Sequence, residues 1–110
     1  MEGRQVIEAT CPDCRGPLTE VNNGDFRQYR CLVGHRYAAR SLLEAHSETQ
    51  ENTLWSAVAA LEESANLVRA VAPDLAPELA ERLQRQAEKK KEQAEQIRRI
   101  LEQLEPFQLD

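Results

Sequence analysis

The sequence predicts a small α+β protein, in which a short β-rich segment precedes a long antiparallel α-helical hairpin. Three observations support this prediction. All three cysteines and all four glycines precede residue 40, whereas the remainder is rich in Ala, Leu, Glu and Gln, which favour helices. Two close Cys/His pairs flank a hairpin signal, and two apolar stripes with helical spacing flank a proline-containing break. We therefore expect a β-rich domain over residues 1–40 and a helical domain over residues 41–110.

The β-rich segment contains a strong hairpin signal. Residues 17–21 read as a short strand, and residues 26–30 alternate apolar or aromatic with polar side chains, as a half-buried strand does. Asn22-Asn23-Gly24-Asp25 lies between them, and Asn and Gly tolerate the positive φ of a tight turn. Residues 36–38 could add a third short strand.

The two Cys/His pairs have the spacing of a metal site. The pattern is Cys11-x2-Cys14, sixteen intervening residues, and then Cys31-x3-His35. Zinc takes four such ligands in a tetrahedron, and two tight turns with two ligands each provide them. We expect Gly16 and Gly34 to ease these turns. The sequence therefore predicts one structural zinc ion per chain in a zinc ribbon, bound by Cys11, Cys14, Cys31 and His35.

Other uses of these cysteines are less consistent with the sequence. An odd number of cysteines argues against a disulfide framework, and a redox-active Cys-x-x-Cys would need a βαβ context. Unligated buried cysteines, or iron in place of zinc, remain alternatives. Four protein ligands fill the coordination shell, whereas a catalytic zinc keeps one position open, so we expect no enzymatic activity. Since structural zinc binding contributes about 10–16 kcal/mol, the metal should decide whether residues 9–40 fold.

The helical part predicts two helices. Ser41 and Glu44 form a capping-box pattern, which predicts a helix over about residues 41–72. Proline is poorly tolerated within a helix, so residues 73–77 predict a break before a second helix over about residues 78–105. The apolar stripes are Leu54, Val58, Leu61, Ala65, Val68 and Ala72, then Leu79, Leu83, Ala87, Lys90, Ala94, Ile97, Leu101 and Leu104.

These stripes carry more apolar surface than one narrow seam between two helices needs. We predict that the excess pairs two chains as a homodimer. Packing of the helices onto the ribbon is the alternative. The predicted partner surface consists of Leu54, Trp55, Leu61, Ile97 and Leu101.

Charge and hydropathy exclude several functional classes. The net charge is −5, and residues 41–110 carry fourteen acidic residues against eight Lys and Arg, which is not the footprint of a DNA-binding protein. Residues 1–40 carry six arginines against five acidic residues, which leaves a nucleic-acid-binding ribbon as the alternative. No apolar run could span a membrane, and no export signal is evident, so we expect a cytoplasmic protein.

Several segments together resemble a known family. Residues 10–14 (TCPDC), 26–35 (FRQYRCLVGH), 41–43 (SLL) and 54–57 (LWSA) are similar to the zinc-ribbon and helical tail of CheB-type chemotaxis protein-glutamate methylesterases. The resemblance covers roughly residues 9–104. It implies that the four Cys/His residues hold the metal, and it implies by association a role in bacterial chemosensory or two-component signalling. No Gly-x-Ser-x-Gly elbow is present, so methylesterase activity is not expected here.

Taken together, the sequence predicts a non-catalytic interaction or regulatory module with an unknown protein partner.

Overall fold

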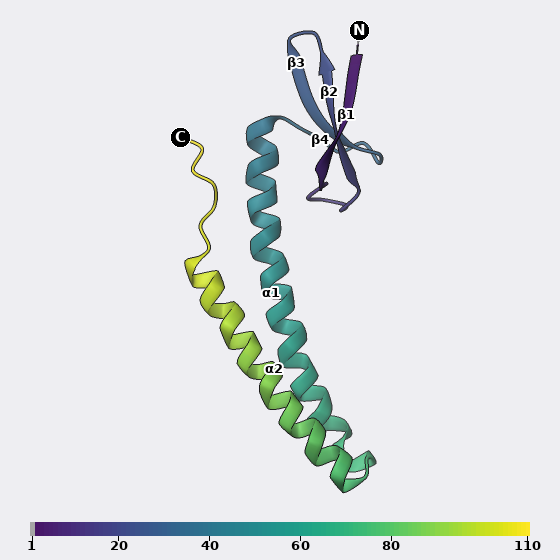
Figure 1. The fold of residues 1–110 in the computed structure, drawn as a ribbon, viewed down its shortest axis with the longest axis vertical. Coiled ribbons are helices and arrows are strands. Elements are labelled where there is room, and N and C mark those ends of the chain that lie inside the picture. Colours follow the sequence, from purple (N-terminus) through teal and green to yellow (C-terminus); the bar gives the residue numbers. More distant parts are fainter. Residues whose placement is uncertain (1) are drawn as a thin grey trace. The chain divides into compact units, whose positions relative to one another are not determined.

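The computed structural model describes residues 2–110 and is an α+β structure, as predicted: an antiparallel sheet is followed by two helices (Figure 1). The chain forms two compact units. The first contains the described residues up to Thr49 together with Pro106–Asp110, and the second contains Gln50–Glu105. In chain order the elements are β1 (Glu2–Thr10), β2 (Pro17–Asn23), β3 (Phe26–Cys31), β4 (Arg36–Tyr37), α1 (Ala39–Val71), the 3-10 turn η1 (Ala72–Asp74) and α2 (Pro77–Gln103).

The sheet of the first unit is larger than the predicted hairpin. Its four strands lie in the order β1-β2-β3-β4, and each pairs antiparallel with the next. The β2–β3 hairpin turns at Gly24, whose φ is 66°, in agreement with the predicted turn. Strand β1 was not predicted, because residues 2–5 lack an apolar alternation. Its backbone pairs with β2, which supplies partners that a sequence pattern does not reveal.

The core of the first unit is small. It contains the buried side chains of Cys11, Leu18 and Cys31, and the hydrophobic residues packed against it include Tyr37 and Leu42. Two of these three clustered residues are predicted metal ligands, and Val21 is buried outside the cluster. The apolar core of this unit therefore includes part of the candidate metal site.

Helix α1 begins two residues before the predicted start at Ser41. The amide of Leu42 donates to the carbonyl of Ala38, which makes Ala39 the first helical residue. The predicted capping box at Ser41 and Glu44 thus lies inside the helix and caps nothing. Strand β4 ends at Tyr37, so the chain enters the helix almost directly from the sheet.

The second unit is an antiparallel helical hairpin, as predicted (Figure 1). Helix α2 begins at Pro77, a position where the missing N–H of proline leaves no helical bond unmade. The helices bury mainly small side chains, which allow two helices to approach closely. Lys90 of the predicted stripe is exposed. The buried residues are Val58 and Ala65 on α1 and Ala87 and Ala94 on α2.

Candidate metal centre

The four predicted metal ligands come together in the first unit. Cys11 follows β1, and Cys14 lies in the turn that leads to β2. Cys31 is the last residue of β3, and His35 immediately precedes β4. Their ligand atoms all lie within 4.8 Å of one another, close enough to bind one metal ion. Two turns that are distant in sequence thus present two ligands each.

The first turn is closed by backbone hydrogen bonds. The amide of Cys11 donates to the carbonyl of Gly16 at 2.7 Å, and the amide of Arg15 donates to the carbonyl of Cys11 at 2.8 Å. The left-handed residue of this turn is Arg15, with φ of 64°, and not Gly16 as the sequence suggested. The backbone therefore reverses one residue earlier than expected, and Arg15 adopts a conformation that glycine would adopt more easily.

The second turn has the same construction. The amide of Gly34 donates to the carbonyl of Cys31 at 3.2 Å, and the amide of Cys31 donates to the carbonyl of His35 at 3.1 Å. Gly34 has φ of 114°, a conformation that L-residues rarely adopt, so glycine has the predicted role here. The amide of His35 also points at Cys31 Sγ, 3.3 Å away. This turn therefore brings Cys31 and His35 into the ligand cluster and places a backbone N–H donor beside the Cys31 sulfur.

Backbone amides stabilise two of the thiolates. Burial acts to raise the pKa of Cys31, but hydrogen bonds from the backbone of His35 and Gly34 outweigh it and lower the pKa to about 6. Burial likewise opposes the shift at Cys11, where backbone hydrogen bonds from Cys14 and Asp13 and the contact with the Tyr37 hydroxyl lower the pKa. These donors favour the charged form, which is the form that binds metal.

The pKa values of the third thiol, Cys14, and of the His35 imidazole are raised. The Gly16 backbone acts to lower the pKa of Cys14, but burial and the neighbouring Cys31 and Cys11 thiols raise it. The pKa of His35 is raised, chiefly by its contact with Cys31. Three thiolates this close repel one another, so the cluster suits a cation at its centre.

The sequence did not identify one pair of residues beside the ligands. The Tyr37 hydroxyl, on β4, donates a hydrogen bond to the carboxylate of Asp13, and its oxygen lies 3.7 Å from Cys11 Sγ. Tyr37 therefore links the two ligand turns and touches a ligand sulfur. Asp13 and Tyr37 are 24 residues apart, and no local pattern connects them. The only sequence feature that could have indicated this contact is the acidic residue inside the Cys-x-x-Cys motif.

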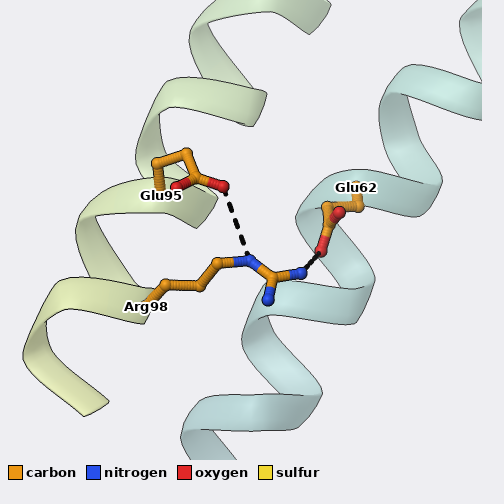
Figure 2. Close-up of polar contacts among 3 residues, drawn as sticks. All are labelled: Glu62, Glu95 and Arg98. Atoms are coloured by element: carbon orange, nitrogen blue, oxygen red, sulfur yellow. Dashed lines mark hydrogen bonds and ion pairs between the residues drawn. The ribbon is translucent and has the colours of Figure 1, made fainter. Parts of the chain in front are cut away.

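The five predicted partner residues all lie in the helical unit. Leu54, Leu61, Ile97 and Leu101 are partly exposed, and Trp55 is 45% exposed. Arg98 of α2 organises the surroundings of Trp55, since its guanidinium carbon lies 5.6 Å from the centre of the indole ring. The same guanidinium donates to Glu62 of α1 at 2.6 Å and faces Glu95 at 3.5 Å (Figure 2). Trp55 therefore lies beside a polar contact that links the two helices.

No family model, curated protein or solved structure matches this chain. In addition, none of the helices in residues 2–110 has the length and apolar content needed to cross a membrane.

Proposed function

We propose that this chain is a non-catalytic interaction or regulatory module whose first unit is held together by one structural zinc ion. The observation that carries the proposal is the complete ligand set of three thiols and one imidazole. A catalytic zinc keeps a position for water or substrate, whereas a four-ligand shell of this kind is typical of structural sites. The metal would then stabilise the fold, and the surface of the protein would bind its partners.

The spacing of the ligand atoms is consistent with a tetrahedral zinc ion. A tetrahedral ion with Zn–S near 2.3 Å and Zn–N near 2.0–2.1 Å separates two sulfurs by about 3.8 Å and sulfur from nitrogen by about 3.6 Å. The sulfurs of Cys14 and Cys31 lie 3.6 Å apart, and His35 Nδ1 lies 3.6 Å from Cys11 Sγ and 3.3 Å from Cys31 Sγ. Thiolate and imidazole are also the donors that zinc prefers.

The partner surface belongs to the helical unit in this proposal, and it pairs with a second copy of the chain. Trp55 and Ile100 expose 45% and 51% of their surfaces, and both are large apolar side chains. Tryptophan is among the residues that most often dominate the energetics of protein interfaces, and an exposed isoleucine adds apolar area beside it.

The sequence resemblance to the tails of CheB-type methylesterases supports a setting for the module. We place it in the bacterial cytoplasm, in chemosensory or two-component signalling, with a signalling protein as the second partner. This assignment rests on the resemblance alone, because a fold does not specify a function.

The test combines metal analysis with capture of partners. The tagged chain, expressed in its native cells, should contain about one zinc per polypeptide and should retain a specific protein partner on native purification. Leu61→Glu should lose the second copy of the chain, whereas Gln96→Glu, which adds the same charge at an exposed position of α2, should keep it. Zinc-free protein, or a set of retained proteins that is identical for both variants, would contradict the proposal.

A further inference from the structure

We propose that Cys14 is a modification site for peroxides, at which oxidation joins Cys14 to Cys31 in a disulfide and releases the structural metal. This site deepens the proposed function and rests on it, since the four ligands must hold a metal for oxidation to release it. Its basis is the exposure of one ligand thiol and the short distance from that thiol to a second one on the other ligand turn.

The three thiols differ in their access to solvent. Cys14 is exposed, whereas Cys11 is fully buried and Cys31 is only 8% exposed. Gly16 presents no side chain to Cys14, and a Cβ at this position would lie 3.4 Å from the Cys14 sulfur. The susceptibility of a cysteine to oxidation follows its exposure and its thiolate character, and a metal ligand is held as the thiolate. A small oxidant such as hydrogen peroxide would therefore reach Cys14 first.

Cys31 is the thiol that can complete a disulfide with Cys14. The two sulfurs lie 3.6 Å apart, and a disulfide bond is about 2.05 Å long, so the sulfurs must approach by about 1.5 Å. Cys31 is the last residue of β3 and is paired with Leu18 of β2, which fixes its backbone in the sheet. The exposed Cys14 lies in a turn and is therefore the residue that would move.

Cys11 is the less suitable partner for Cys14. Its side chain is fully buried, and its sulfur lies 3.7 Å from the Tyr37 hydroxyl, which in turn donates to Asp13. Rotation of Cys11 toward Cys14 would break the contact with Tyr37, whereas a bond between Cys14 and Cys31 leaves this contact in place. The disulfide therefore links the two ligand turns and is not that of a redox-active Cys-x-x-Cys pair.

The reaction consumes one peroxide and two thiolates. The Cys14 sulfur attacks a peroxide oxygen, the O–O bond breaks, and Cys14 becomes a sulfenic acid as hydroxide leaves. The Cys31 thiolate then attacks the Cys14 sulfur, the S–S bond forms, the S–O bond breaks, and a second hydroxide leaves. Two electrons thus pass from the two thiolates to the peroxide, which is reduced to two hydroxide ions.

Oxidation removes half of the ligand set. The sulfurs of a disulfide are no longer thiolates, and the thiolate is the form that binds metal. Cys11 and His35 remain, whereas a structural zinc takes four ligands, so the chain would lose the ion. A dithiol reductant would exchange with the disulfide, restore both thiolates and allow the metal to bind again.

The experiment treats the zinc-loaded full chain with hydrogen peroxide. A chromophoric chelator measures the released zinc, and mass spectrometry without reduction identifies the disulfide after cleavage before Asp13 and after Arg15 and Arg30, which separates the three cysteines. We expect one zinc released for each Cys14–Cys31 disulfide formed, and zinc binding restored by a dithiol. Retention of zinc with three free thiols, a main product with Cys11 in the disulfide, or zinc release without any disulfide would overturn the proposal.

Variants that keep four metal ligands test the roles of the two cysteines. Cys31→His and Cys11→His each leave two thiolates and two imidazoles, which is also a structural zinc shell. In Cys31→His, peroxide should leave a sulfenic acid on Cys14 that dimedone traps. Cys11→His is the matched control and should form the disulfide as the wild-type chain does. A disulfide that forms as readily in Cys31→His as in Cys11→His would refute the role of Cys31, and the wild-type product decides the matter if either variant holds no zinc.

Failure of this proposal is distinguishable from failure of the proposed function. The zinc content before peroxide is added tests the proposed function alone. If the untreated chain holds about one zinc and keeps it in peroxide, only the modification site is refuted. If the untreated chain holds no zinc, the proposed function fails first.

Discussion

The ligand side chains differ in what holds each of them in place. Cys11 and Cys31 are buried and receive hydrogen bonds from backbone amides, so their positions follow from the fold of the two turns. Cys14 is exposed, and its pKa is raised in part by the other two thiols. A metal bound here would displace the proton of Cys14 and compensate the repulsion among the three thiolates. We therefore expect the position of Cys14 to depend more on a bound metal than the positions of Cys11 and Cys31 do.

Loss of one ligand should abolish tight metal binding. His35→Ala and Cys14→Ser each leave three protein ligands, and we expect the metal content to fall from about one ion per chain to near zero after dialysis against a weak chelator. Elemental analysis measures this. His46→Ala is the matched control, because His46 lies on α1 outside the cluster. Full zinc content and unchanged stability in His35→Ala would contradict the ligand assignment.

Tyr37→Phe should weaken the site without removing a ligand. The substitution deletes the hydroxyl that donates to Asp13 and approaches Cys11 Sγ, while the ring remains in the core. Residues that orient metal ligands typically contribute about tenfold to a hundredfold in affinity, and we expect a loss in that range. Competition with a chromophoric zinc chelator measures it. Tyr29→Phe, on the neighbouring strand, is the control and should bind zinc normally.

At the scale of elements, the sequence predicted the features that depend on a few neighbouring residues. The Asn-Gly turn and the spacing of two ligands per turn depend on a few adjacent residues, and the structure places the hairpin and the ligand cluster as predicted. Strand β1 and the Tyr37–Asp13 contact depend on partners distant in the sequence, so no local pattern contained them. The start of α1 was misplaced because β4 runs almost directly into the helix, which leaves the capping signal at Ser41 unused.

Removal of the metal should unfold the sheet and leave the helices formed. The buried apolar set of the first unit includes two ligands, so its core is too small to fold unaided. The helical unit buries its own side chains between its two helices and contains no predicted metal ligand. After treatment with EDTA, we expect the amide NMR signals of β1 to β4 to collapse to unfolded positions, with most of the helical circular dichroism retained. Dispersed sheet signals in the presence of EDTA would contradict a structural role for the metal.

The alanine seam of the helical hairpin should not tolerate larger side chains. Ala94 is only 1% exposed and lies between the helices together with Val58, Ala65 and Ala87. Ala94→Leu forces the helices apart, and overpacking of this kind destabilises by about 1–3 kcal/mol. Thermal unfolding followed by circular dichroism measures the effect. Gln93→Leu adds a similar side chain at an exposed neighbouring position and should leave the stability nearly unchanged.

At the scale of the whole molecule, the small seam raises the question of what stabilises the helical unit. Three of its four buried residues are alanines, which remove little apolar surface from water. Larger apolar side chains of the same unit remain accessible: Leu67 is 62% exposed and Ile100 is 51% exposed. An isolated pair of helices with so little buried area is marginal, and pairing of two hairpins into a four-helix bundle would bury the remainder.

We therefore expect a homodimer with about twice the 12.5 kDa mass of the chain in size exclusion coupled to light scattering. Leu61→Glu or Ile97→Glu places a charge on the predicted partner surface, and each should shift the mass to that of a monomer while the zinc content stays at about one ion per chain. Gln96→Glu, at an exposed neighbouring position, should remain dimeric. A monomeric wild-type chain at concentrations of tens of micromolar would refute the dimer and would assign the exposed apolar surface of the helices to a different protein.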